Sequence, residues 1–337
     1  MKEAYLYEKL PQERVRCNLC NHHCIIKEGA KGICGVRENR KGVLYTLVYD
    51  KVIASNLDPI EKKPLYHFLP GSTSYSIATV GCNFRCVFCQ NSDISQMPRD
   101  HGMIMGDRIT PEEIVSSSLR LGASSISYTY TEPTVYFELA LDCARSATKK
   151  GLKNVFVTNG YMSEDSLREI YPDLHGANVD LKSFKDSFYK RECGARVEPV
   201  LKNIQLMKEM GIWVEVTTLL IPGLNDSKEE LRDIARFLKE IDPDIPWHIS
   251  RFHPQYRLTH IPPTPTSLIH MAKDIGYEEG LRFVYTGNIP GDVGENTFCP
   301  ECGTLLIERF GFYIKKNLLK EGRCPKCNEK IPGIWKI

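Results

Sequence analysis

The chain has 337 residues, with 44 basic and 42 acidic side chains and a formal net charge of +2. This length exceeds what one simple core usually holds, so we expect one large domain with small appended modules. The near balance of charge argues against nucleic acid or an anionic membrane as a partner. No apolar run is long enough to span a bilayer, and residues 1–9 lack the apolar core of a signal peptide, so the sequence predicts a cytoplasmic protein.

Thirteen cysteines are the main chemical signal of the composition. Eleven of them fall into three tight groups with the spacing of metal ligands, and a chain this long does not need disulfides to fold. The sequence therefore favours metal binding over a disulfide scaffold. Cys143 and Cys193 stand outside these groups, and a lone cysteine is by default a small buried apolar residue.

The first group lies near the N-terminus and has C-x2-C-x3-C-x9-C spacing. Its members are Cys17, Cys20, Cys24 and Cys34. Four thiolates complete a tetrahedral zinc site without further ligands, so a structural zinc knuckle is our first interpretation. A second iron–sulfur cluster and unliganded thiols are the alternatives. We expect the neighbouring His22 and His23 to be exposed loop residues, because four cysteines already suffice.

The second group has C-x3-C-x2-C spacing and follows a strand-like run at 75–80. Its members are Cys82, Cys86 and Cys89. Three thiolates can hold three corners of a cubic iron–sulfur cluster, whereas the usual ferredoxin arrangement supplies a cysteine for each iron. One iron then stays open to a non-protein ligand. The alternative is a zinc site that takes His101 or water as its fourth ligand.

The third group lies near the C-terminus and consists of two C-x2-C knuckles that are separated by 21 residues. Its members are Cys299, Cys302, Cys324 and Cys327. Strand-like runs at 305–307 and 312–314 lie between the knuckles, which is typical of a zinc ribbon. A rubredoxin-like iron centre is the alternative.

The segment between the first two groups is mostly irregular. Two short runs, 43–49 and 52–54, are rich in β-branched and aromatic residues and are predicted strands. Residues 58–71 contain two X-Pro breaks and no clear period, so we predict a loop near the central cysteines. Lys62, Lys63 and His67 in this loop are candidates for substrate contact, and packing is the alternative.

From residue 75 onward, short β-rich runs alternate with longer helical patterns, which is typical of parallel strands joined by crossover helices. The predicted strands are 76–80, 125–130, 154–158, 178–182, 213–219 and 247–252. The predicted helices are 111–121, 134–150, 164–171, 198–210 and 228–240. A further helix at 267–274 and a strand at 282–285 follow. The fold class is therefore α/β, as an open, partial (β/α)6 TIM-type barrel.

This pattern divides the chain into three predicted parts. Residues 1–72 form an N-terminal cysteine-rich module with short strands, 73–290 form the partial barrel and 291–337 form the zinc ribbon. In TIM-type barrels the chemistry lies at the carboxyl ends of the strands. The polar signals follow this rule, since they come directly after predicted strands. They are found at 82–89, 129–134, 157–160, 180–183, 217–226 and 251–253.

Together these motifs resemble the radical SAM superfamily, and within it the pyruvate formate-lyase-activating enzymes. The C-x3-C-x2-C motif has Phe88 in the aromatic place that precedes the last cysteine in that family. Residues 128–134, 247–254 and 284–288 look more closely like the radical SAM proteins of the AmmeMemoRadiSam system. The resemblance spans about residues 15–297 and implies a partial-barrel radical SAM core.

The resemblance also assigns roles at the strand ends. Glu132 matches the acid that receives the ammonium of S-adenosylmethionine (SAM), Asp180 and Lys182 match the element near its carboxylate and ribose, and His253 matches a residue at the adenine end. A carboxylate is a natural partner for a desolvated ammonium. The full set of predicted cofactor-binding residues is Glu132, Thr158, Asn159, Asp180, Lys182, Thr217 and His253.

By resemblance, the open iron of a [4Fe–4S] cluster binds SAM, and reductive cleavage gives a 5'-deoxyadenosyl radical that abstracts hydrogen from a substrate. A low-potential donor such as flavodoxin or ferredoxin is implied. The substrate is a protein, as for the activating enzymes, or a small molecule. Memo-like and AMMECR-like proteins are partners implied by the resemblance alone. An interpretation of a different class is a zinc-rich binding protein without radical activity.

Overall fold

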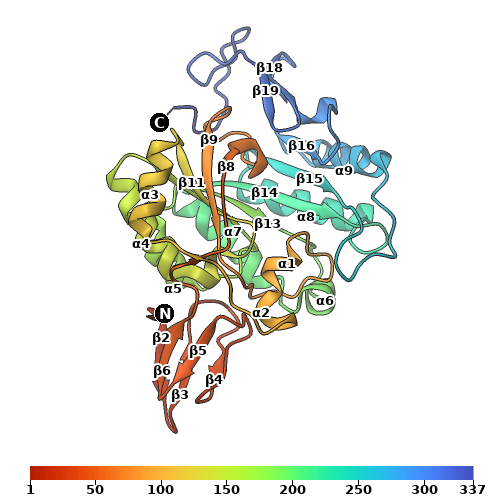
Figure 1. The fold of residues 1–337 in the computed structure, drawn as a ribbon. Coiled ribbons are helices and arrows are strands. Elements are labelled where there is room, and N and C mark those ends of the chain that lie inside the picture. The colour runs from red at the N-terminus through yellow and green to blue at the C-terminus, as the bar shows by residue number, and fades with distance from the viewer. Residues whose placement is uncertain (337) are drawn as a thin grey trace.

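The computed structural model describes residues 1–336; residue 337, the last of the predicted ribbon segment, lies outside the described part. A central eight-stranded sheet lies between two small cysteine-containing modules, which occupy opposite ends of the molecule (Figure 1). In spatial order its strands are β16 (Val284–Gly287), β15 (Trp247–Arg251), β14 (Trp213–Leu220), β13 (Gly176–Asp180), β12 (Lys153–Thr158), β11 (Ser125–Tyr128), β9 (Thr73–Ala78) and β8 (Ala54–Pro59).

All neighbouring strands of this sheet are parallel except β8 and β9, which run antiparallel. The predicted α/β core is thus confirmed, and the predicted strand at 282–285 joins the sheet as β16. The edge strand β8 was not predicted, and it lies inside the segment assigned from sequence to the N-terminal module. Its alternating polar residues and Pro59 hid it, because such residues are depleted in strands but tolerated at a sheet edge.

The connecting helices bury their apolar faces against the sheet, which explains their 3.6-residue pattern. They are α3 (Pro111–Arg120), α4 (Phe137–Lys149), α5 (Glu164–Ile170), α7 (Glu198–Glu209), α8 (Lys228–Ile241) and α9 (Thr266–Glu278). The α-helix predicted from residue 134 begins at Phe137 and is preceded by the 3-10 turn η2 (Pro133–Tyr136), in which the Glu132 side chain accepts a hydrogen bond from the backbone N–H of Thr134. No helix within residues 1–336 is long and apolar enough to cross a membrane.

The N-terminal module contains more strands than the sequence predicted, because most are only two to four residues long. They are β1 (Lys2–Glu3), β2 (Tyr7–Leu10), β3 (Arg14–Cys17), β4 (Ile25–Ile26), β5 (Arg37–Arg40), β6 (Val43–Thr46) and β7 (Lys51–Val52), which pairs with β10 (Asp107–Arg108).

Short helices also occur outside the N-terminal module. They are η1 (Ile60–Lys62), α1 (Ser92–Ser95), α2 (Met97–Asp100), η3 (Tyr171–Asp173), α6 (Asp186–Phe188), the π-helix η4 (Tyr189–Cys193) and η5 (Val293–Glu295).

The C-terminal module is an antiparallel sheet of β17 (Thr297–Phe298), β18 (Leu305–Phe310) and β19 (Tyr313–Asn317). It packs on the open side of the barrel. Its buried Leu306 and Ile307 share a cluster with Tyr66, from the loop after β8, and with Tyr285 of β16. The ribbon thus bridges the two ends of the open sheet and covers part of the segment that was predicted to be a loop at 58–71. That segment is mostly buried; it contains the end of β8 and the 3-10 turn η1, and the rest is irregular.

Candidate active site

The loop after β9 carries the central cysteines. Its backbone is anchored by hydrogen bonds from Arg85 N–H to the carbonyl of Cys193 at 2.9 Å and from Val87 N–H to the carbonyl of Glu192 at 3.0 Å. The partner segment is the π-helix η4, so an irregular helix holds the cysteine loop. Cys193 is fully buried, as predicted for a lone cysteine, and it does not line the cavity described next.

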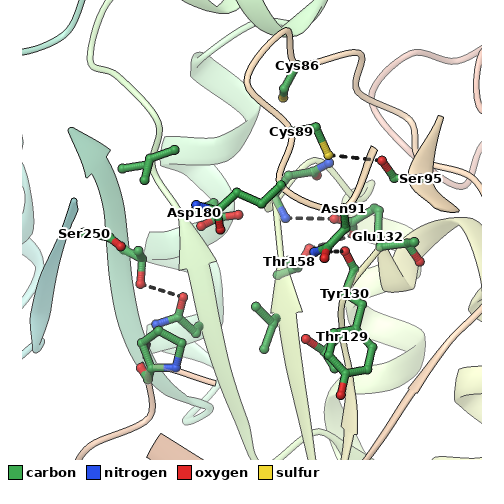
Figure 2. A pocket seen from close by; sticks show the side chains of 18 of the residues that line it. Cys86, Cys89, Asn91, Ser95, Thr129, Tyr130, Glu132, Thr158, Asp180 and Ser250 are labelled. Carbon is green, nitrogen blue, oxygen red and sulfur yellow. Dashed lines mark hydrogen bonds between the residues drawn. The ribbon is translucent and has the colours of Figure 1, made fainter. Parts of the chain in front are cut away.

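The three thiols face a cavity of about 500 Å³ at the carboxyl ends of the strands. Figure 2 shows Cys86 and Cys89 above the strand ends that carry Glu132, Thr158 and Asp180. Sequence reasoning placed these side chains on one rim because parallel strands end at a common edge. The predicted residues that line the cavity are Cys82, Cys86, Cys89, Glu132, Thr158, Asn159, Asp180, Lys182 and Thr217.

Glu132 is a buried carboxylate that the protein holds in one orientation. Its Oε2 accepts a hydrogen bond from the backbone N–H of Asn159 at 2.8 Å, and its Oε1 accepts one from the hydroxyl of Thr158 at 2.7 Å. Burial raises the pKa of Glu132, although these hydrogen bonds oppose the shift. A fixed and partly desolvated carboxylate binds a cationic group strongly.

Asp180 and Lys182 form an ion pair on the neighbouring strand end, with 3.0 Å between Nζ and the carboxylate oxygen. Burial opposes the charge of Lys182 and is the largest single influence, but the Asp180 carboxylate together with the thiolates of Cys86 and Cys193 outweighs it and raises the pKa of the ammonium. The ammonium also lies 5.8 Å from the ring centroid of Phe88, within the cysteine motif. A permanent positive charge therefore lies beside the cysteines, where it can neutralise an anionic ligand group.

The other predicted residues orient the wall of the cavity. Asn159 donates from Nδ2 to Oδ1 of Asn83 at 2.7 Å, and this links the end of β12 to the cysteine loop. The hydroxyl of Thr217 donates to Oδ1 of Asn178 at 2.9 Å, and both side chains line the cavity. Asn178 was not predicted to be a site residue, since it lies inside β13 rather than at its end.

Two candidates from the sequence lie elsewhere. His253 is exposed and does not line the cavity, because the chain leaves the sheet after β15 and is tied to Thr264 through the backbone N–H of Phe252. His67 is fully buried under the C-terminal ribbon, whereas Lys62 and Lys63 do reach the cavity wall.

Several lining residues were not named as site residues from the sequence. Tyr130 has φ of 62°, and its side chain and carbonyl contact Asp58 and Asn91 respectively. Phe312 reaches the cavity from the C-terminal ribbon. Ser250 and Asn288 lie at the ends of β15 and β16, and Asn288 donates to the Ser250 hydroxyl at 2.9 Å. Their strand-end positions were the one available clue, since 284–288 had been noted only as a family motif.

The two other cysteine groups also assemble. Cys17, Cys20, Cys24 and Cys34 line one cavity between the N-terminal module and the barrel. His22, predicted to be exposed, is partly buried there and forms a 2.9 Å hydrogen bond with the carbonyl of Asn83. The C-terminal sulfurs lie much closer together. Within residues 1–336, Cys299, Cys302, Cys324 and Cys327 form the one group of three or more candidate metal ligands whose atoms all lie within 4.8 Å of one another.

The first parallel strand leads into a C-x3-C-x2-C loop, and this loop faces an acid after β11 and a lysine after β13. This arrangement is the one expected for an iron–sulfur enzyme whose cluster has an open iron. Residues 76–238 match the Radical SAM superfamily. The chain belongs to this superfamily and is a radical SAM enzyme. The finer likeness to the AmmeMemoRadiSam system stays a prediction.

The chain is 50% identical over 334 residues to an uncharacterized protein of Methanocaldococcus jannaschii, covering 98% of this chain and 99% of the relative. It is 25% identical over 167 residues to the pyruvate formate-lyase-activating enzyme of Clostridium pasteurianum, covering 48% of this chain and 67% of the relative. The crystal structure of Streptococcus suis SuiB bound to S-adenosylmethionine has a TM-score of 0.52 at 14% identity, covering 72% of this chain and 56% of SuiB. That last likeness concerns the fold alone.

The superfamily implies a [4Fe–4S] cluster and SAM, and the residues present fit both. Three thiols, and no fourth cysteine, line the cavity among the described residues, which leaves one corner of a cubane without a protein ligand. The acid Glu132 and the ammonium of Lys182 lie on the same cavity, so opposite charges are available for the amino and carboxylate groups of SAM.

Proposed function

We propose that this enzyme uses the cavity to generate a 5'-deoxyadenosyl radical that abstracts a hydrogen atom from a protein substrate, in the manner of glycyl-radical-enzyme activation. The observation that carries the proposal is that the three thiols, Glu132 and the Asp180–Lys182 pair all line one cavity of about 500 Å³. When bound, the cluster and SAM supply the chemistry: one electron, SAM and a substrate C–H bond give methionine, 5'-deoxyadenosine and a substrate radical.

The chain's own residues bind SAM and hold it in one orientation. Glu132 accepts hydrogen bonds from the cofactor's ammonium, and Lys182 neutralises its carboxylate. Thr158 and Asn159 hold Glu132 through the hydrogen bonds described above, so the carboxylate needs no rearrangement when SAM binds. A substrate segment that fills the open side of the cavity would exclude water and so protect a reactive radical from side reactions.

A protein substrate is supported by the surface beside the cavity. Phe312 lines the cavity, and Phe310 and Tyr313 on the same hairpin are 50% and 72% exposed. Aromatic residues are enriched in protein–protein contacts, so this hairpin offers a place for a partner chain whose reactive segment enters the cavity. A flavodoxin or ferredoxin is the electron donor in this proposal.

The test is anaerobic 5'-deoxyadenosine formation by the Cys86→Ala variant. We expect no product above background, because two thiols no longer hold the cluster. Cys143→Ala is the matched control, since that buried thiol lies in α4 outside the site, and it should retain activity. Full activity of Cys86→Ala would overturn the proposal, and zinc without iron at this group would favour a zinc-binding protein instead.

The substrate class has its own measurement. Candidate partner proteins are examined by mass spectrometry after turnover with labelled SAM. A modified or cleaved partner chain supports a protein substrate. Product formation that depends on a small molecule and leaves every partner unchanged contradicts it.

A further inference from the structure

The N-terminal cysteines enclose a second cavity that the radical SAM site does not use. Cys17, Cys20, Cys24 and Cys34 line it together with apolar side chains from the module and from the barrel, including Leu19, Ile26 and Val135. We propose that this cavity holds a second [4Fe–4S] cluster, with all four irons ligated by cysteine, and that it passes electrons to the cluster at Cys82, Cys86 and Cys89.

The spacing of the sulfurs separates a cluster from zinc. Zinc–thiolate bonds of about 2.3 Å put tetrahedral ligand sulfurs about 3.8 Å apart. The C-terminal group has this size, since Sγ of Cys299 and Cys327 lie 3.5 Å apart and those of Cys302 and Cys324 lie 3.6 Å apart. A cubane holds its cysteine sulfurs further apart, at about 6 Å, because an iron lies behind each one.

The N-terminal group does not have the size of a zinc site. Within the described residues, its cysteines are not among the side chains that form a compact group of candidate metal ligands, although all four line a single cavity. The three sulfurs of the radical SAM motif behave in the same way: they share a cavity and are too far apart to form a compact group. The N-terminal group therefore resembles the cluster site of this protein and differs from its zinc-sized site.

Two buried polar groups on the cavity wall also indicate a missing ligand. Arg37 and Asn83 are each 1% exposed and line the cavity. Nε of Arg37 and Nδ2 of Asn83 have no hydrogen-bond partner among the described residues. A buried donor without a partner is destabilising, because it has lost its hydrogen bonds to water. Cluster sulfides and thiolates accept such N–H hydrogen bonds, and these bonds help to set the potential of a cluster.

Asn83 connects the two sites. It follows Cys82 directly in the chain, its carbonyl is bonded to His22 of the N-terminal module, and its Oδ1 accepts the hydrogen bond from Asn159 on the SAM cavity. One residue is thus part of the wall between the two cavities. A fully ligated cluster has no open iron for SAM, so its position suits electron transfer rather than a second radical reaction.

The electron-transfer role rests on the proposed function. A reduced flavodoxin or ferredoxin gives one electron to the N-terminal cluster and is itself oxidised, and the cluster then gives that electron to the one at Cys82, Cys86 and Cys89. No atom moves in this step. Ile25 and Ile33, next to Cys24 and Cys34 in the chain, are 55% and 49% exposed, which gives the donor an apolar contact close to the cluster.

The test is metal analysis and electron paramagnetic resonance after anaerobic purification of three forms of the full chain. The triple variant Cys82→Ala/Cys86→Ala/Cys89→Ala should keep about four irons and four sulfides, and its reduced signal should not respond to SAM. The double variant Cys20→Ala/Cys34→Ala should also keep about four irons, but its signal should change when SAM is added. The wild-type chain should hold about eight irons.

Folding of the triple variant is checked by circular dichroism and by zinc at the C-terminal group. A folded triple variant that binds zinc and no iron would overturn the proposal of a second cluster and leave the proposed function intact. The opposite failure is distinct: a double variant without a SAM-responsive signal, beside a triple variant with iron, would sink the proposed function alone. Because the double variant has lost the second cluster, its 5'-deoxyadenosine formation driven by flavodoxin should fall below that of the wild type much more than its formation driven by dithionite. Equal losses would exclude the electron-transfer role.

Discussion

The two four-cysteine groups at the ends of the molecule have the same ligand atoms and different geometry. At the C-terminus the sulfurs have closed to zinc-sized distances, and Cys327 is exposed. At the N-terminus the sulfurs stay apart around a cavity that the barrel helps to enclose. Counting cysteines therefore does not identify the metal; the backbone that presents them decides how far apart the sulfurs lie.

The difference arises in the turns. In each C-terminal knuckle, the residue after the second cysteine has a left-handed backbone, with φ of 67° at Gly303 and 63° at Asn328. These turns are closed by hydrogen bonds to the carbonyls of Cys299 and Cys324, so both sulfurs of a knuckle point to one centre. The N-terminal group contains one C-x2-C pair, and its other cysteines follow at spacings of three and nine residues, so it lacks a second knuckle of this kind.

Removal of the zinc that the spacing predicts for the C-terminal group should disrupt that module and has the largest expected effect. A structural zinc contributes on the order of 10 kcal/mol in small zinc domains, so chelation should unfold the ribbon. Hydrogen exchange should accelerate strongly in β18 and β19 and stay unchanged in β3. Cys302→Ser should reproduce the effect and Cys143→Ser should not. Unchanged exchange in β18 after zinc loss would show that packing alone holds the ribbon.

The buried ion pair between Arg37 and Glu138 joins the N-terminal module to the barrel, and its removal tests the N-terminal half of the comparison. Arg37 donates two hydrogen bonds to the fully buried Glu138 of α4, at 2.7 and 2.9 Å. Arg37→Met leaves that carboxylate unpaired and should destabilise the protein by about 3–5 kcal/mol in urea unfolding. Arg16→Met, which breaks an exposed pair with Glu8, should cost less than about 1 kcal/mol.

A second variant separates the lost charge from lost packing. In Arg37→Met/Glu138→Leu both charges are gone, so most of the lost stability should return. If the double variant is as unstable as Arg37→Met, the pair contributes through shape rather than charge. Iron content measured alongside shows whether the module still holds its metal.

The contact between the ribbon tail and the barrel should make a smaller contribution to the free energy of unfolding, and this contribution depends on pH. Burial lowers the pKa of His67 to about 4, and the neutral ring is bonded to the carbonyl of Pro332 at 2.7 Å and to the hydroxyl of Tyr285 at 2.6 Å. The unfolded chain binds a proton near pH 6.5 and the folded chain does not, so stability falls as the pH drops from about 6.5 to 4.

The free energy of unfolding should fall by up to about 1.4 kcal/mol per pH unit where His67 is fully protonated in the unfolded chain and neutral in the folded chain. This fall is measured as the difference between wild type and His67→Gln, because zinc release at low pH affects both proteins equally. Parallel stability curves for the two proteins over this range would contradict the assignment.

Much of the core could be predicted from the sequence because its signals are local. The helix α3 begins one residue after Thr110, whose side chain forms a capping box with Glu113. The parallel strands are short runs rich in β-branched and aromatic residues, and they are mostly buried although several contain serine, threonine or asparagine. Their order along the chain, together with the rule that parallel strands end at one edge, brought the cysteines and Glu132 to the same cavity in the prediction.

The rest depends on contacts between distant segments. Phe312 reaches the cavity only because the ribbon folds back on the open side of the barrel, and no local pattern encodes that docking. His67 was a candidate substrate residue until the structure placed it under the same ribbon. Asn178 belongs to the site because alternate residues of β13 face the interior, which sets its direction but gives no hint of its role.

The antiparallel edge strand β8 also has a kinetic consequence. It pairs with β9 across a connection of residues 60–72, whereas every other pair in the sheet needs a crossover helix between its strands. Contacts close in sequence form with less loss of chain entropy, so this hairpin can assemble first and serve as a template for β11. The sheet is then expected to grow in one direction from β9 to β16, and the cysteine loop at the end of β9 is in place before the strands that complete its cavity.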